Sequence, residues 1–135
     1  MKTIEELDRE IQQDPNNAEL YRLRGCEYMY KDENDRAIED FNLSIQLDPN
    51  NAHTFLQRAT AYSKKEDDDS SIKDYDQVIK LNPNEARAYC FRGCAYGYKG
   101  DVDKCISDLE TALQIAPDFS LAKEKLLEAR KIRGY

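Results

Sequence analysis

The residues of this sequence that could do chemistry are four cysteines and one histidine. Cys90 and Cys94 are four residues apart, so on a helix they share one face and could bind a metal ion together with Cys26 or His53. The spacing lacks the tight CxxC loop of zinc ribbons, and a single histidine limits the ligand set. Small buried thiols are also common packing residues. We therefore expect neither a metal site nor a cofactor.

The sequence shows no other arrangement typical of an enzyme. It contains no Ser/His/Asp or Cys/His set and no glycine-rich phosphate loop. Residues 66–69 form an acidic run, but an EF-hand calcium loop needs a glycine and a distal glutamate at positions where this run has none. Such a run is typical of a solvated turn before a helix. We therefore expect a protein that is not an enzyme.

The composition favours a soluble helical protein. Of the 135 residues, 40% are hydrophobic and 35% are charged, with only five glycines and four prolines. The net charge of −7 argues against nucleic acid as a partner, because phosphate binding needs a basic face. The sequence shows neither a run of about eighteen apolar residues nor a secretory signal. We therefore expect no membrane segment, a cytoplasmic location and reduced thiols.

The elements that must position these residues are repeated along the chain. The four prolines are spaced 34 residues apart, at Pro15, Pro49, Pro83 and Pro117. A fixed period of this length is typical of stacked repeat proteins. It divides a single domain into a half copy, three full copies and a capping helix, at residues 1–17, 18–51, 52–85, 86–119 and 120–135. The apolar spacing predicts two helices in each full copy.

Each full copy has the same order of side-chain sizes. An aromatic residue precedes a small residue, a tyrosine, a second small residue, a large residue and a proline, which in the first copy are Tyr21, Gly25, Tyr28, Ala37, Phe41 and Pro49. The small pair lets two helices approach near the short end of the usual separation of about 8–10 Å. In these residues the chain resembles the tetratricopeptide repeat family. The resemblance implies an all-α fold, a right-handed superhelix of antiparallel helix pairs with about eight helices.

The resemblance also implies a concave groove lined by the first helix of each copy. The family's concave positions correspond here to Arg22, Cys26, Tyr30, Leu56, Thr60, Lys64, Arg87, Cys90, Cys94 and Tyr98. Aromatic and basic residues tend to dominate interfaces, although the tyrosines could instead only cover apolar surface. We expect a non-enzymatic scaffold that binds a peptide or helix of a partner protein, with acidic character, in this groove.

Two other interpretations remain open. In the first, the unpaired helix at residues 1–14 packs on another copy of the chain and forms a dimer or a larger scaffold. In the second, the chain binds the C-terminal peptide of a chaperone, as one subset of the family does with a clamp of lysine, asparagine and arginine side chains. At the clamp positions this chain has Arg22, Cys26, Gln57, Arg87 and Phe91. Only the two arginines keep the charge that the clamp needs.

A repeated charge pattern predicts a ladder of ion pairs. One repeated position, where the family usually has leucine, is occupied by Arg24, Arg58 and Arg92. Another is occupied by Glu6, Asp40, Asp74 and Asp108. Because guanidinium binds carboxylate through two hydrogen bonds, we expect pairs between adjacent helices with a structural role. The spacing leaves open whether each arginine pairs within its own copy or with the preceding one.

Overall fold

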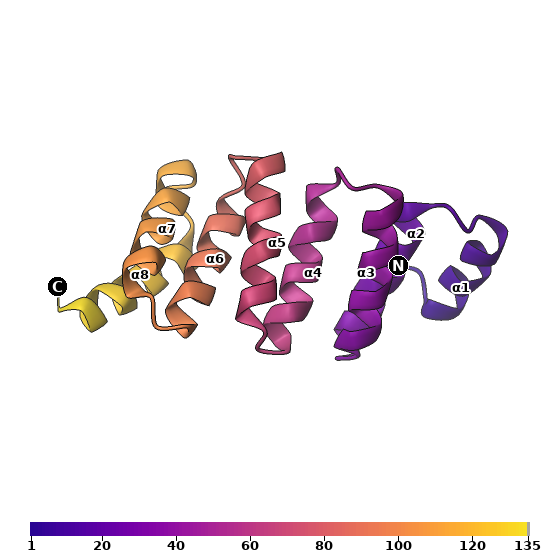
Figure 1. Ribbon diagram of the computed structural model, residues 1–135, viewed down its shortest axis with the longest axis horizontal. Helices are drawn as coiled ribbons and strands as arrows, with labels where there is room; N and C mark the ends of the chain where they lie inside the picture. Colours follow the sequence, from indigo (N-terminus) through magenta and orange to yellow (C-terminus); the bar gives the residue numbers. More distant parts are fainter. Residues whose placement is uncertain (135) are drawn as a thin grey trace.

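In the computed structural model, residues 1–134 are described, and these residues form eight α-helices and no β-strand. The helices are α1 (Ile4–Gln13), α2 (Ala18–Tyr30), α3 (Asn34–Leu47), α4 (Ala52–Lys64), α5 (Asp68–Leu81), α6 (Ala86–Tyr98), α7 (Val102–Ile115) and α8 (Ser120–Arg133). They follow one another along a single long axis (Figure 1). The predicted all-α architecture of about eight helices is confirmed.

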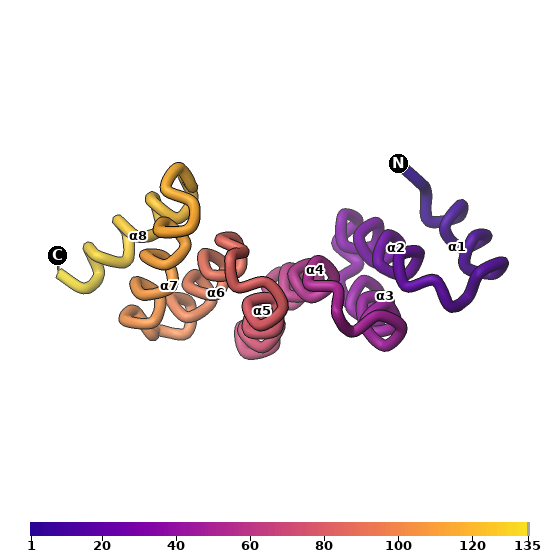
Figure 2. The backbone as a smooth tube through the Cα atoms, turned by 90° about the horizontal axis from the view of Figure 1, so that it is seen from above, coloured from indigo at the N-terminus to yellow at the C-terminus, as the bar shows by residue number. Residues whose placement is uncertain are grey.

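The helices form pairs that stack on one another. Helices α2 and α3, α4 and α5, and α6 and α7 pack closely, and the second helix of each pair also packs on the first helix of the next. Helix α1 packs on α2, while α8 packs on α7 and touches α6. Figure 2 shows that the array curves, so that α1 and α8 both rise on the side where α2, α4 and α6 lie. The first helices of the pairs therefore line the concave side.

Small residues let the two helices of a pair approach closely, as the sequence predicted. In the first pair, Gly25 of α2 lies against Phe41 of α3, and a Cβ atom placed on Gly25 would be only 2.7 Å from Phe41 Cε1. In the second pair, Ala59 and Ser71 are fully buried. The core is therefore divided among successive pairs, as expected for a stacked repeat.

The turn inside each pair has the same backbone conformation. Asp32 and Glu66 have φ values of 60°, and Gly100 has a φ of 89°, at positions 34 residues apart. In the first turn the N–H of Glu33 donates to the carbonyl of Tyr28 at 2.9 Å and closes the end of α2. A left-handed conformation favours glycine. The first two turns nevertheless adopt it with Asp32 and Glu66, and only the third has a glycine.

The C-terminal helix α8 covers the last pair with one face. Ala122, Leu126 and Ala129 are buried, and Leu121 is half-buried. Leu127 lies on the outer face and is 61% exposed. Helix α8 thus packs on the third helix pair and leaves one leucine in solvent. None of the helices in residues 1–134 is long and apolar enough to cross a membrane.

Candidate functional site

The interior of each helix pair contains an arginine bound to a carboxylate. Arg58 of α4 donates from Nε and Nη2 to the two carboxylate oxygens of Asp74 on α5, at 2.8 and 2.7 Å. The aspartate is buried. The same two bonds, each of 2.8 Å, join the equivalent residues of the other pairs, Arg24 with Asp40 and Arg92 with Asp108. We call this series the arginine ladder.

Each arginine of the ladder also bonds to the preceding copy of the repeat. The Nη1 of Arg58 donates to Oδ1 of Asn42 on α3 at 2.8 Å. Equivalent bonds, of 2.9 and 2.8 Å, join the other two arginines to Asp8 and Asp76. The arginines therefore bond both within their own copy and to the preceding one, which is the point that spacing alone left open.

The outer partners of the ladder were not predicted from the sequence. The repeat pattern predicts that Glu6 joins the ladder, but Glu6 is exposed, and it is Asp8 that bonds to Arg24. Asp8, Asn42 and Asp76 are themselves 34 residues apart, so the period was a signal that could have identified them. A search for repeated charges misses this column, because Asn42 has an uncharged amide.

The surroundings of the ladder arginines explain why the ladder is structural. The guanidinium carbon of Arg58 lies 5.6 Å from the ring centre of Phe55 and 5.8 Å from that of Tyr62. Burial raises the pKa of Asp74, and the hydrogen bonds from Arg58 partly oppose that effect. Because Nε, Nη1 and Nη2 of this arginine are all engaged, we interpret the ladder as a device that holds helices together.

One column of groove residues faces solvent. Tyr30, Lys64 and Tyr98 are 34 residues apart at the C-terminal ends of α2, α4 and α6, and the two tyrosines are 66% and 71% exposed. Ile132 of α8 continues the column and is 75% exposed. The Nζ of Lys64 donates to the carbonyl of Met29 at 3.2 Å, so the lysine bridges α4 and α2. We call these four side chains the exposed column.

The basic residues near the other end of the groove helices are paired with carboxylates. Arg22 donates to both carboxylate oxygens of Glu19 and, from Nη1, to Oε1 of Gln57 at 3.0 Å. Arg87 donates from Nε to Glu85 at 2.8 Å. Hydrogen bonds from the arginines hold the pKa values of Glu19 and Glu85 below their ordinary values. An acidic ligand would therefore have to compete with carboxylates of the protein itself.

The other predicted groove residues are covered to different extents. Cys26, Leu56 and Cys90 are buried. Thr60 is half-buried, and its hydroxyl donates to the carbonyl of Leu56 at 3.1 Å. Cys94 is half-buried. The structure therefore brings the exposed column and Arg87 to the open surface of the groove, whereas the side chain of Arg22 is only 13% exposed and the smaller side chains lie deeper.

The four cysteines are free thiols. Burial raises the pKa of Cys26 to about 11 and also raises that of Cys105. Across the described part of the chain, no three His, Cys, Asp or Glu side chains cluster closely enough to hold a metal ion.

Three segments of the sequence match family models described as tetratricopeptide repeat, at residues 18–51, 52–85 and 86–119. Together they cover most of the chain and coincide with the three helix pairs. The chain belongs to the tetratricopeptide repeat family. The resemblance seen in the sequence is confirmed, together with the fold that it implied.

Solved structures of other tetratricopeptide repeat proteins superpose well on this chain. A crystal structure of MamA has a TM-score of 0.92 at 27% identity, covering 97% of this chain and 77% of MamA. The second such domain of human RPAP3, in complex with the HSP70 peptide SGPTIEEVD, has a TM-score of 0.79 at 27% identity, covering 84% and 98%. The first domain of Spaghetti (RPAP3), bound to an HSP90 peptide, shares the fold at 23% identity, with a TM-score of 0.85 and coverages of 88% and 94%. No curated protein sequence matches the chain.

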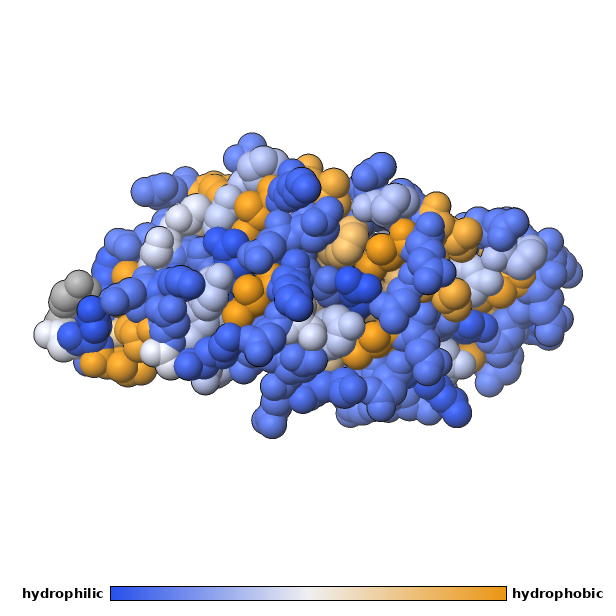
Figure 3. Space-filling view, viewed as in Figure 1, coloured by the Kyte–Doolittle hydropathy of each residue, from blue (hydrophilic) through white to orange (hydrophobic). Residues whose placement is uncertain are grey.

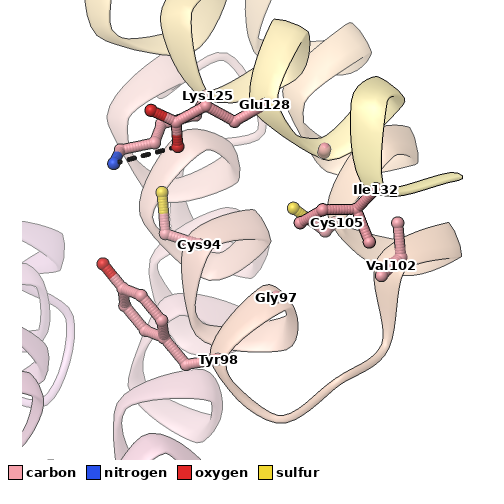
Figure 4. Close-up of a pocket in the computed structure, with 9 residues that line it drawn as sticks. Cys94, Gly97, Tyr98, Val102, Cys105, Lys125, Glu128 and Ile132 are labelled. Carbon is pink, nitrogen blue, oxygen red and sulfur yellow. Dashed lines mark hydrogen bonds and ion pairs between the residues drawn. The ribbon is translucent and has the colours of Figure 1, made fainter. Parts of the chain in front are cut away.

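The surface of the tetratricopeptide repeat array is mostly polar but contains apolar hollows. Figure 3 shows one face covered largely by hydrophilic residues, with smaller hydrophobic patches between them. One hollow in the groove lies between α4, α5 and α6 and is lined by Thr60, Lys64 and Phe91. A second lies between α6, α7 and α8, where Cys94 and Tyr98 form one wall (Figure 4). Both hollows lie beside the exposed column.

Proposed function

We propose that this protein is a non-enzymatic interaction scaffold whose concave groove holds a segment of a partner protein. Membership of the tetratricopeptide repeat family supports a role in protein–protein interaction. The RPAP3 domain, 27% identical, is a neighbour of the same fold that carries a peptide in its solved complex. The partner's binding segment would lie across α2, α4 and α6 in an extended or helical conformation.

The observation that carries this proposal is the exposed column. If Tyr30 and Tyr98 served only to cover apolar surface of the protein, they would be largely buried. Instead they are 66% and 71% exposed. Exposed tyrosines offer large, rigid and amphipathic contact area, and tyrosine is enriched at energetically dominant interface positions. With Lys64 between them, they give a partner alternating aromatic and basic contacts at a regular interval of one repeat.

The partner's acidic character follows from the basic residues of the groove. Arg22, Lys64 and Arg87 are the donors, but Arg22 and Arg87 are already paired with Glu19 and Glu85. Lys64 also has a carboxylate neighbour, since its Nζ lies 3.5 Å from Oδ1 of Asp32. A partner carboxylate would replace one of these glutamates, an exchange between similar ion pairs that adds little affinity. We therefore assign most of the binding energy to the aromatic contacts and the orientation of the segment to the charges.

The decisive experiment is selection of phage-displayed peptides on the immobilised protein. We expect enriched peptides whose binding is lost in the double variant Tyr30→Ala/Tyr98→Ala. The matched control is Leu43→Ala/Leu47→Ala, which removes two side chains that are 40% and 42% exposed on α3 and should leave binding intact. Equal binding by both double variants would exclude the groove as the site.

Binding of a chaperone C-terminal peptide is the weaker alternative within the same groove. At the clamp positions, Cys26 is buried and Phe91 packs on Tyr75, with ring centres 6.2 Å apart. Neither side chain can supply the hydrogen bonds of a carboxylate clamp. We expect the peptide SGPTIEEVD to bind with a Kd weaker than about 1 mM in calorimetry, and binding in the micromolar range would restore this alternative.

Self-assembly is a second candidate, favoured by the register of the terminal helices. Helix α8 begins at Ser120, in the register of the first helices at Ala18, Ala52 and Ala86, and α1 has the register of the second helices. Helix α8 of one copy and α1 of another would therefore complete one more helix pair. Sedimentation velocity over a wide concentration range tests this, and association should be abolished by Leu127→Glu. A single monomeric species at every concentration would reject it.

A further inference from the structure

Three of the four cysteines gather at one end of the groove. Cys94 on α6 and Cys105 on α7 line the same apolar hollow. Cys90 lies one helical turn before Cys94 and is fully buried behind it. The groove-binding proposal makes no use of these thiols, and the second repeat has Thr60 where the third has Cys94.

The thiols differ in their access to solvent. Cys94 is half-buried, whereas Cys26, Cys90 and Cys105 are at most 7% exposed. In Figure 4 the sulfur of Cys94 points from α6 toward the ion pair of Lys125 and Glu128 on α8. Among these thiols, Cys94 is therefore the one that a dissolved reagent can reach.

The environment of Cys94 also favours the reactive thiolate. Hydrogen bonding with the Cys90 thiol lowers the pKa of Cys94, and burial opposes this effect. The ammonium group of Lys125 lowers the pKa further, and the carboxylate of Glu128 raises it by a smaller amount. The thiolate is the nucleophilic form of cysteine, and a neighbouring lysine is a typical feature of reactive sites. For Cys105, burial is the largest influence and the pKa is raised.

The walls of the hollow indicate what kind of molecule would fit. Val102, Ala129 and Ile132 supply apolar surface on the sides contributed by α7 and α8. Tyr98 closes the side toward the middle of the groove, and Lys125 lies at the polar rim beside the sulfur (Figure 4). A ligand with an aliphatic tail and a polar, electron-poor head would place its tail on these walls and its head near Cys94 and Lys125.

We propose that Cys94 is a covalent modification site for α,β-unsaturated aldehydes with an aliphatic tail. In the reaction the Cys94 thiol first releases its proton to water. The sulfur then forms a bond to the β-carbon of the aldehyde, and the π electron pair of the carbon–carbon double bond moves toward the carbonyl group. The α-carbon finally takes a proton from water. The thiol has then added across the double bond, and neither an oxidant nor a leaving group is needed.

The test compares two aldehydes that share a reactive head, trans-2-nonenal with a tail and acrolein without one. Intact-mass and peptide mass spectrometry of the full chain should show one nonenal adduct, at Cys94, with the whole mass of the aldehyde added. For each aldehyde, the rate of reaction with Cys94 is divided by its rate with glutathione. We expect this ratio to be about tenfold higher for nonenal than for acrolein, because a few methylene groups of the nonenal tail leave water and enter the hollow. Ile132→Ser should remove most of this advantage, and since Ile132 is exposed the variant should stay folded.

A matched variant tests whether the reactivity of Cys94 comes from the hollow or from its position on the helix. Thr60→Cys/Cys94→Thr moves the thiol to the same position one repeat earlier, away from the walls formed by α7 and α8. We expect this variant to react with nonenal at about the rate of an ordinary exposed thiol. The proposal is overturned if nonenal spreads over several cysteines of the native protein, if it shows no advantage over acrolein, or if the relocated thiol of the exchanged variant reacts as fast as Cys94 of the native protein. None of these measurements depends on what the groove binds.

Discussion

The arginine ladder and the groove occupy different faces of the same helices and obey different constraints. Arg58 and its two equivalents make the same three hydrogen bonds in successive helix pairs, with lengths between 2.7 and 2.9 Å. Two residues earlier along the same helices, Arg22, Leu56 and Cys90 share neither charge nor exposure. The inner arginine–aspartate pair is the same in each repeat because the two helices of each repeat pack in the same way. The groove carries no such constraint, so its differences hold the information about the partner.

The largest expected effect is a difference in stability between variants that remove the inner and the outer partner of one ladder arginine. Asp108→Ala leaves the guanidinium of Arg92 without its buried bidentate partner and should cost about 3 kcal/mol in the free energy of unfolding. Asp76→Ala removes the other partner of the same arginine, whose side chain is half-exposed, and should cost less than about 1 kcal/mol. Urea denaturation measures both, and equal losses would show that burial is not what gives the ladder its strength.

A smaller effect is expected where helices touch through glycine. Gly25→Ala puts a methyl group 2.7 Å from the Phe41 ring, and overpacking should outweigh the gain in helix propensity by about 1–2 kcal/mol. Gly97→Ala places its methyl group 3.3 Å from the Cys105 sulfur at an exposed position, and we expect no loss of stability. Thermal denaturation of the two variants checks this contrast. A loss in both would mean that the groove surface is packed as tightly as the interior.

Replacing a groove arginine should scarcely change stability. Arg22→Leu introduces the residue that the second repeat has at this position, Leu56, and removes bonds to the exposed Glu19 and to the half-buried Gln57. We expect a change in the free energy of unfolding below about 0.5 kcal/mol. If this variant were as unstable as Asp108→Ala, the distinction between ladder and groove would fail.

The smallest effect concerns the dependence of stability on pH. Burial lowers the pKa of His53 below 6.5, and the positive charges of Arg22 and Arg87 contribute. The unfolded chain therefore binds this proton more readily, so the contribution of His53 to stability is present above about pH 6.5 and is lost as the pH falls through the folded-state pKa. Between about pH 7.5 and pH 5 the native protein should lose slightly more stability than His53→Gln. A parallel pH dependence of the two denaturation midpoints would contradict the assignment.

The sequence predicted the repeated part of the molecule well, because the same pattern of side-chain sizes occurs in three copies along the chain. Pro49 and Pro83 marked the boundaries between helix pairs, and Gly25 marked the close approach to Phe41. The inner ladder was expected for the same reason. Asp8 and Asn42 were missed, since their column mixes a carboxylate with an amide and only the arrangement in space joins it to the arginines.

The groove was harder to predict because family positions do not fix exposure. Cys26 and Cys90 were expected to line the groove, but short side chains at these positions lie beneath longer neighbours and are buried. Tyr30 and Tyr98 reach past those neighbours into solvent. Which residues are accessible depends on side-chain length and on packing between adjacent helices, neither of which the repeat pattern contains. The selection of groove residues therefore remains a prediction that the binding experiments must test.

The outer bonds of the ladder have a mechanical consequence. Along the array, Asp8, Asn42 and Asp76 bond to arginines of the following repeat, and the two carboxylates are about half-exposed, at 46% and 52%. Added salt weakens exposed ion pairs but has little effect on a bond to a neutral amide. Added salt should therefore weaken the bonds of Arg24 to Asp8 and of Arg92 to Asp76 more than the bond of Arg58 to Asn42. Exposed ion pairs such as Lys65 with Asp35 join the same two repeats as Asn42 and should weaken as well. The strength of the contacts between repeats, and with it the span of the groove, would then change with ionic strength.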